Sequence, residues 1–269
     1  MGRFDGKTVL IAGCKGAADE IAKIICEEGG TVIVNDPDSS LTDAIEAPVA
    51  EKLNYGTSME DTRAMIDELI GKWVTDETTK QSSKESDGKY SALHAVIMNY
   101  DEFEVCKMRA DQLTLEAYNT AMDVNVRSLF HLFGAIREYY RSKQGTKEQA
   151  SVVVMTSVVG LAGLTQLSTL YAAAKGAVNG MIRSVAKEFG RYANVNGVSQ
   201  GFYSEKKNPV GPKDRLKGDY QLQMTDRAKE ELTYNDVAKM VAYLASDDAH
   251  MISGQIISVD GGLWLRVQA

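Results

Sequence analysis

The sequence predicts an α/β fold, in which residues 1–269 form a single domain around a Rossmann-type, doubly wound parallel sheet. Short β-branched runs alternate with longer amphipathic segments, as they do in chains of βαβ units. The expected strands are continuously apolar, which is typical of parallel strands covered on both faces. A chain of 269 residues, 44% hydrophobic and 25% charged, is also long enough to bury the core of one large globular domain.

The first expected unit is a strand, a helix and a second strand in close succession. Residues 7–12 contain the run Thr-Val-Leu-Ile and predict a buried strand. Residues 17–28 place isoleucines at helical spacing, and a glycine pair then ends the helix. Residues 31–34 form the next strand, which an Asn-Asp-Pro turn closes. Two strands this close, joined by one helix, indicate a parallel βαβ unit.

The middle of the chain predicts two helices on either side of a strand. Residues 59–74 are amphipathic, whereas residues 75–90 are strongly polar and are expected to form a surface insertion. Residues 93–98 predict the next strand. Thr114 is the expected N-cap of a long helix that runs to about residue 140.

The C-terminal half continues the alternation. Strands are expected over residues 152–155, 196–199 and 255–259, and helices over residues 168–189 and 236–245. Residues 201–227 lack clear periodicity, and we expect a lid-like segment there. No internal repeat and no second domain is evident.

Composition and charge exclude several classes of function. The formal net charge is −7 and no basic stripe stands out, so no nucleic-acid partner is expected. The three cysteines have no metal-ligand spacing, so no metal is expected and a reducing cytoplasm is the simplest location. No apolar run reaches membrane-spanning length and no long apolar segment precedes the first strand, so we expect no membrane association and no export.

Tyr171 and Lys175 carry the strongest chemical signal in the sequence. They stand four residues apart on a predicted helix, so both lie on one of its faces. A tyrosine has a pKa near ~10, and a nearby ammonium group lowers that pKa by stabilising the phenolate. The pair is therefore a candidate general acid/base. Ser157, at the end of a strand, could hydrogen-bond a substrate oxygen and share its developing charge.

A Tyr-x-x-x-Lys spacing also arises by chance on exposed helix surfaces. Here it is accompanied by Thr-Ser-Val-Val-Gly after a strand and by Lys-Gly-Ala-Val from Lys175 onward. With these motifs the chain resembles the short-chain dehydrogenase/reductase family along nearly its whole length. The resemblance implies alcohol/ketone interconversion of a small-molecule substrate with NAD. It implies a catalytic set of Asn125, Ser157, Tyr171 and Lys175, in which Asn125 holds a water that links the lysine to solvent.

The resemblance also implies cofactor-binding residues, namely Gly13, Gly16, Asp36, Asn99 and Lys175. A glycine-rich turn lets backbone N–H groups approach a pyrophosphate at a helix N-terminus. Asp36 follows the second strand, where an acid accepts hydrogen bonds from an adenosine ribose and favours NAD over NADP. An ordinary turn aspartate before Pro37 is the alternative, and the sequence leaves both open.

The cofactor motifs depart from the family pattern at several positions. Residues 13–19 read Gly-Cys-Lys-Gly-Ala-Ala-Asp in place of Gly-x-x-x-Gly-x-Gly, and Asp19 is expected to add negative charge near the pyrophosphate. After the fourth strand, Tyr100 and Asp101 replace small residues and add bulk and charge. Glu205 stands about where a threonine is usual. Together these changes predict that NAD binding is weak or lost in this chain and that NAD belongs to an active partner subunit.

Three functions follow from this conflict between a retained catalytic set and an altered cofactor site. The preferred hypothesis is a supporting subunit of a heteromeric oxidoreductase, as in the hydroxyacyl-CoA dehydrogenase of anaerobic benzylsuccinate breakdown. The alternatives are an active NAD-dependent dehydrogenase/reductase and, last, a ligand-sensing regulator. The expected partner is a homologous subunit, in a dimer or tetramer built through the helices of Asn125 and Tyr171 and the C-terminal strand. Apolar residues on more than one face of the long helix suggested that surface: Leu129, Phe130, Leu132, Phe133 and Ile136.

Overall fold

The computed structural model describes residues 2–73, 93–103, 106, 108–142, 150–162, 169–201 and 232–263. Its strands are β1 Thr8–Ala12, β2 Thr31–Asn35, β3 Glu51–Leu53, β4 Leu93–Met98, β5 Ala150–Ser157, β6 Ala193–Gln200 and β7 Ile256–Val259. Its α-helices are α1 Ala18–Glu27, α2 Ser39–Asp43, α3 Met59–Trp73, α4 Leu115–Met122, α5 Ser128–Ser142, α6 Val159–Ala162, α7 Thr169–Phe189 and α9 Tyr234–Ala245. Short 3₁₀ turns cover Ala110–Gln112 and Asp247–Ala249, and a π-helical turn covers Asp123–Arg127.

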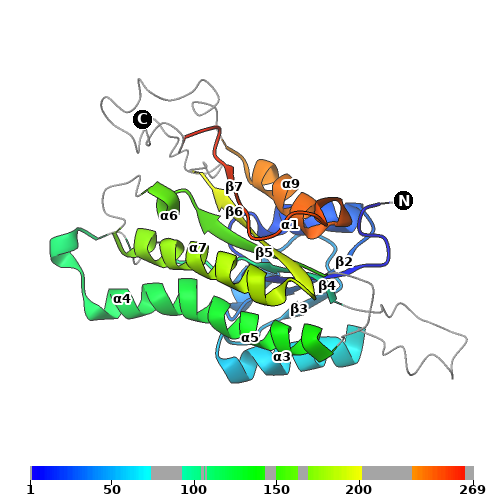
Figure 1. Ribbon diagram of the computed structural model, residues 1–269. Coiled ribbons are helices and arrows are strands. Elements are labelled where there is room, and N and C mark those ends of the chain that lie inside the picture. Colours follow the sequence, from blue (N-terminus) through cyan, green and yellow to red (C-terminus); the bar gives the residue numbers. More distant parts are fainter. Residues whose placement is uncertain are drawn as a thin grey trace, which may run out of the picture.

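The seven strands form one sheet in the order β3-β2-β1-β4-β5-β6-β7, and all six pairings are parallel. Helices cover both faces (Figure 1). The winding reverses between β1 and β4, which lie side by side at the centre. In open α/β sheets, ligands bind at such a reversal, beyond the carboxyl ends of the strands. This architecture confirms the predicted fold class.

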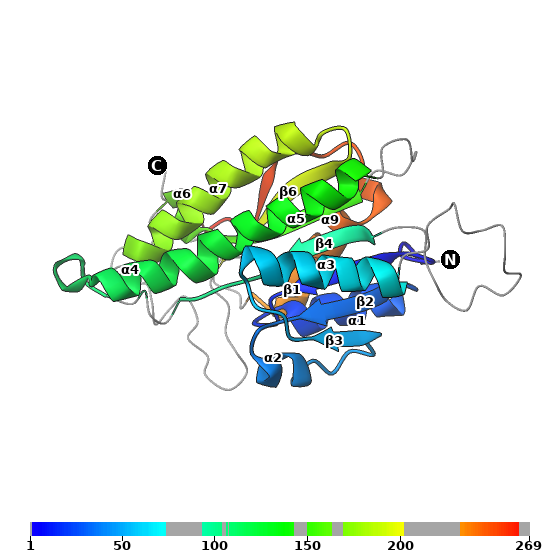
Figure 2. The same cartoon turned by 90° about the horizontal axis from the view of Figure 1, so that it is seen from below.

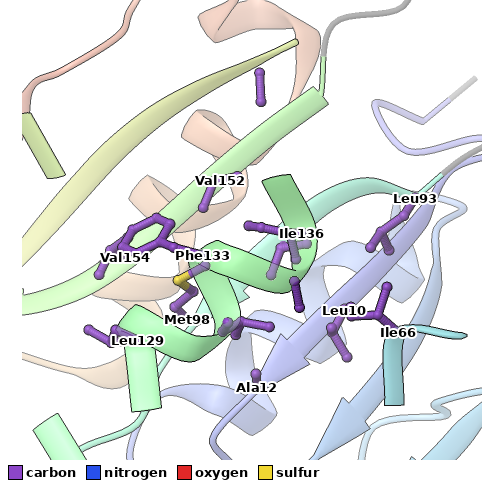
Figure 3. Packing of buried hydrophobic residues seen from close by; sticks show 14 of the residues in the cluster. Leu10, Ala12, Ile66, Leu93, Met98, Leu129, Phe133, Ile136, Val152 and Val154 are labelled. Carbon is purple, nitrogen blue, oxygen red and sulfur yellow. The ribbon is translucent and has the colours of Figure 1, made fainter. Parts of the chain in front are cut away.

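Two hydrophobic layers hold the helices to the sheet. The helices α3, α5 and α7 pack on one face, and α1 and α9 pack on the other (Figure 2). Successive residues of β1 pack into opposite layers. Leu10 packs with α3, α5 and α7 (Figure 3), and Ile11 packs with α1 and α9. A strand with both sides buried has no polar face, which explains the continuous apolar run of its sequence.

The expected helices and strands are present, with most bounds shifted by a few residues. The long helix differs, because the π-helical turn divides it into α4 and α5. Thr114 is the N-cap of α4, and its hydroxyl accepts a hydrogen bond of 3.1 Å from the N–H of Ala117. The expected polar insertion lies outside the described residues, as does the expected lid-like segment apart from Gly201. Within the described part of the chain, no helix is long and apolar enough to cross a membrane.

The apolar residues proposed as an assembly surface are mostly part of the core. Of the five residues, all in α5, Phe130 is exposed, at 60% of its surface. The other four point into the core and are buried: Leu129, Leu132, Phe133 and Ile136. The expectation of excess apolar faces on this helix is therefore wrong for four of the five residues. The sheet and the neighbouring helices of the same chain cover them.

Candidate active site

The candidate catalytic residues lie beyond the carboxyl ends of the central strands. Ser157 is the last residue of β5, Tyr171 and Lys175 lie in the first two turns of α7, and Asn125 lies in the π-helical turn. Each is at least 94% buried. The interpretation of Tyr171 and Lys175 as chance surface residues is therefore wrong.

The close approach of α6 to α7 positions Ser157 beside this helix. A Cβ added at Gly160 of α6 would lie 2.7 Å from the backbone carbonyl carbon of Lys175, so only glycine permits this approach. The Ser157 hydroxyl accepts a hydrogen bond of 3.3 Å from the N–H of Val159. Residues 163–168, between the two helices, lie outside the described residues.

Tyr171 and Lys175 share one partner, the carboxylate of Asp101. The Tyr171 hydroxyl donates to Asp101 Oδ1 at 2.9 Å, and Lys175 Nζ lies 2.8 Å from the same oxygen. The Lys175 side chain is 2% exposed and that of Asp101 is 25% exposed. Phe103 packs its ring against Tyr171 at 5.0 Å between centroids. The sequence predicted added charge at Asp101 but not its contact with this pair.

Asn125 binds the backbone just after β4. Its Nδ2 donates to the carbonyl oxygens of Glu102 and Ala121, each at 3.0 Å, and its Oδ1 accepts from the N–H of Glu102 at 3.2 Å. π-helical turns occur frequently at functional sites, and this one turns Asn125 toward the chain that leaves β4. The structure therefore shows a positioning contact for Asn125; its water-holding role stays a prediction.

The glycine turn after β1 is closed by the segment that follows β4. Asn99 Nδ2 donates to the carbonyl oxygens of Gly13 and Lys15, at 3.0 and 2.8 Å. Gly13 has φ of 98°, and a Cβ added there would lie 2.5 Å from the carbonyl carbon of Asn99. Gly13 and Asn99 are thus in contact, and the Asn99 amide is engaged within the chain; the cofactor role of Gly13, Gly16 and Asn99 stays a prediction.

Gly13→Ala should strongly destabilise the protein, because alanine suffers both the positive φ and the contact with Asn99. We expect a loss of about 2–3 kcal/mol in the free energy of unfolding, measured by urea denaturation. Gly71→Ala in α3 is the control, since its Cβ would meet nothing within 4 Å; alanine there should gain about 0.5–1 kcal/mol. Equal midpoints for the two variants would contradict the tight approach at Gly13.

Asp36 serves the turn in which it lies. It is 7% exposed, its Oδ2 accepts from the N–H of Cys14 at 2.8 Å, and its Oδ1 accepts from the N–H of Asp38 at 3.0 Å. Burial, followed by the charge of Asp36, raises the pKa of the Cys14 thiol to about 12. Cys14 is therefore a neutral thiol that packs in the core. The turn role of Asp36 is present, and its ribose role stays a prediction.

Asp19 makes contacts that the sequence did not predict. It stands in the first turn of α1, but its Oδ1 accepts from the N–H groups of Glu46 and Ala47, at 2.8 and 2.9 Å. Burial alone would raise its pKa, yet the hydrogen bonds from Lys23 and these N–H groups hold that pKa below its ordinary value. Asp19 thus connects α1 to the chain before β3, and the expectation that its charge opposes a pyrophosphate stays a prediction.

Tyr100 is also placed differently from its expected position. Its ring packs in the core with α3, α5 and α7, and its hydroxyl accepts a hydrogen bond of 3.1 Å from Asn35 Nδ2. Burial raises the pKa of this hydroxyl well above its ordinary value. The bulk of Tyr100 therefore fills the core rather than a cofactor path. Of the two changes expected after β4, only the added charge of Asp101 remains at the candidate site.

Glu102 is a residue of the candidate site that the sequence did not predict. Its Oε2 lies 3.0 Å from Lys15 Nζ, so the lysine of the glycine turn faces a carboxylate. The signal was present as two consecutive acids, Asp101 and Glu102, in the segment that follows β4. The charge of Lys15 is thus paired within the chain.

The residues present fit a nicotinamide dinucleotide poorly as they are arranged. Asp101 occupies the donors of Tyr171 and Lys175, and Glu102 neutralises Lys15. Two neighbouring carboxylates also oppose an anionic diphosphate by charge. Among the described residues, no group of three or more acidic, histidine or cysteine side chains could hold a metal ion.

Comparisons with known proteins agree with this architecture. A family described as Enoyl-(Acyl carrier protein) reductase matches residues 11–264. The chain is 27% identical to the 3-oxoacyl-(acyl-carrier-protein) reductase FabG of Thermotoga maritima, over 97% of this chain and 99% of that protein. Its relatives thus span the whole length of the chain.

Two solved structures show the same fold. One is a gluconate 5-dehydrogenase of Burkholderia cenocepacia in complex with NADP and tartrate, with a TM-score of 0.77 and 20% identity over 97% of this chain and 96% of that chain. The other is a short-chain type dehydrogenase/reductase of Mycobacterium ulcerans, with a TM-score of 0.77 and 23% identity over 98% and 91% of the two chains.

Proposed function

Since this chain belongs to the short-chain dehydrogenase/reductase family of oxidoreductases, we propose that it is a cofactor-impaired supporting subunit of a heteromer. Its partner would be a homologous subunit that binds NAD and interconverts an alcohol and a ketone. The observation that carries this proposal is the bridging carboxylate of Asp101, which binds both Tyr171 and Lys175. A cofactor or substrate that binds this acid/base pair must compete with the Asp101 carboxylate.

The proposed substrate of the complex is a hydroxyacyl thioester. The matched family and FabG are named for reduction of acyl groups carried on acyl carrier protein, which supports an acyl thioester such as a hydroxyacyl-CoA. The kind of assembly we propose is that of 2-[hydroxy(phenyl)methyl]succinyl-CoA dehydrogenase, with one catalytic and one non-catalytic subunit of the same fold.

A supporting subunit needs a surface on which its partner packs. The helices α4 and α5, joined by the π-helical turn, form one long rod beside α7 (Figure 2). Leu115, Tyr118 and Phe130 are exposed along this rod at 74%, 46% and 60%. Exposed apolar side chains mark protein interfaces where they form a contiguous patch, and a partner that packs along the rod would cover all three. We therefore place the partner on the rod formed by α4 and α5.

The second candidate function is an active NAD-dependent dehydrogenase or reductase. One observation favours it: Ser157, Tyr171 and Lys175 are assembled and buried at the carboxyl ends of the strands, where open α/β sheets bind their ligands. Under this alternative Tyr171 is the acid/base, and Asp101 must leave it before a cofactor binds.

NADH binding separates the two functions. We expect the purified chain to bind NADH with a dissociation constant in the millimolar range or weaker, because Asp101 and Glu102 occupy or neutralise the groups that would hold it. Isothermal titration calorimetry measures this constant, and the homologous subunit titrated under the same conditions is the positive control. The gap should reach about 10³-fold, which corresponds to about 4 kcal/mol. A low-micromolar constant for this chain alone would overturn the proposed impairment and favour the active-enzyme alternative.

A further inference from the structure

We propose that Asp101 is an intramolecular ligand of the Tyr171–Lys175 pair, and that this one side chain is the main reason why the chain does not accept a dinucleotide. This inference rests on the proposed function and specifies its cause. The alternative cause would be the sum of many small changes around the glycine turn.

The buried charge of Lys175 is neutralised by Asp101. The Lys175 side chain is 2% exposed, and a buried ammonium group is tolerated only with a counter-ion and hydrogen bonds. Asp101 Oδ1 provides that counter-ion at 2.8 Å. An incoming ligand must therefore displace a charged partner from a buried lysine, rather than enter a vacant site.

The two donor groups of the acid/base pair point in the same direction. The Tyr171 hydroxyl and Lys175 Nζ both point at one oxygen, at 2.9 and 2.8 Å. Two donors that converge on a single oxygen form a receptor for an oxygen ligand. Asp101 satisfies that receptor from within the chain, so the folded protein needs no external ligand to neutralise it.

Hydrogen bonds hold the residues on both sides of Asp101 in place. On one side Asn99 donates to the carbonyl oxygens of the glycine turn. On the other side the backbone N–H and C=O of Glu102 bond the side-chain amide of Asn125, and Glu102 Oε2 lies 3.0 Å from Lys15 Nζ. A carboxylate held in its bound position competes strongly, since little conformational entropy is lost when it binds.

Both glycines of the turn have positive φ, a conformation that glycine adopts readily. Gly13 and Gly16 have φ values of 98° and 61°, and the Asp19 carboxylate is already bound by the N–H groups of Glu46 and Ala47 and by Lys23. The obstacle therefore concentrates in the segment after β4. Of its two acids, Asp101 is the one that touches the acid/base pair.

The test compares NADH binding by the full-length protein and its variants Asp101→Gly and Asp101→Asn, using isothermal titration calorimetry. Asp101→Gly should bind NADH at least tenfold more tightly than the unaltered chain, because it removes both the charge and the bulk. Asp101→Asn should fall between the two, because it removes the charge and keeps an oxygen that can accept from Tyr171 and Lys175. Asp67→Asn, an exposed acid of α3, makes the same change in net charge and should leave binding unaltered.

A second measurement follows the vacated receptor directly. Sodium formate should raise the melting temperature of Asp101→Gly more than that of the unaltered chain, because a free carboxylate can bind the released donors. Should Asp101→Gly not fold, Asp101→Asn decides the same question by its NADH affinity relative to Asp67→Asn.

The two levels of the proposal fail in different ways. If the folded Asp101 variants bind NADH as weakly as the unaltered chain, Asp101 is not the obstacle, and the supporting-subunit function is untouched. If the unaltered chain already binds NADH tightly, the supporting-subunit function is overturned, and this inference with it.

Discussion

Replacing Tyr171 by phenylalanine should leave the turnover of a reconstituted complex with the catalytic partner nearly unchanged. In this chain the hydroxyl donates to Asp101, and under the proposed function it touches no substrate. The substitution removes one hydroxyl group and keeps the ring that packs against Phe103. The same change at the corresponding tyrosine of the partner should reduce turnover by about 10²–10⁴-fold, the typical contribution of a general acid/base.

The measurement is the steady-state kcat of complexes assembled from one altered and one unaltered subunit. Tyr243→Phe, which removes a hydroxyl on the exposed side of α9, is the control for loss of a tyrosine hydroxyl elsewhere in this chain. A drop of 10²-fold or more for Tyr171→Phe, with assembly intact and the control unaffected, would show that this chain carries out the chemistry.

Much of the fold was predictable from the sequence, because the sheet imposes a pattern that repeats locally. β1 reads as an unbroken apolar run since Leu10 and Ile11 face opposite helical layers. Thr114 was predictable as an N-cap because its hydroxyl bonds a neighbour three residues along the chain. Signals of this kind involve residues close in sequence, so the one-dimensional pattern contains them.

The π-helical turn at Asn125 was not predictable in this way. It changes the hydrogen-bond register of a helix without a characteristic composition, so the run from Thr114 onward reads as one α-helix. Its effect is nevertheless large, because Asn125 contacts the segment after β4, more than twenty residues earlier in the chain.

At the candidate site, the sequence predicted the types of the residues but not the directions of their side chains. The sequence indicated Tyr171 and Lys175 by their spacing and Asp101 by its departure from the family pattern. The contact among them joins residues 70 positions apart and depends on how β4 and α7 pack. The hydrogen bonds of Asp19 and the core position of Tyr100 were missed for that reason: the residue type was visible, but the direction of the side chain was decided by tertiary packing.

The stability of the protein should depend unequally on the two partners of the Lys175–Asp101 ion pair. Asp101→Ala leaves an ammonium group that is 2% exposed without its counter-ion, and breaking a buried pair in this way costs about 3 kcal/mol. Lys175→Met leaves a carboxylate that is 25% exposed and still accepts from Tyr171, so water can solvate part of it. An apolar side chain of similar length also packs where the lysine stem lay, so we expect a loss of only about 1 kcal/mol.

Urea denaturation of the two single variants and the double variant completes a thermodynamic cycle. The double variant should lose less stability than the sum of the single variants, because neither charge then remains unpaired. Asp111→Ala is the matched control: Asp111 pairs with Arg109 at 3.1 Å, but both side chains are about two-thirds exposed, and removing an exposed pair should cost about 0–1 kcal/mol. If Asp101→Ala costs no more than Asp111→Ala, the buried lysine does not depend on Asp101, and the carboxylate cannot be the ligand that keeps the acid/base pair occupied.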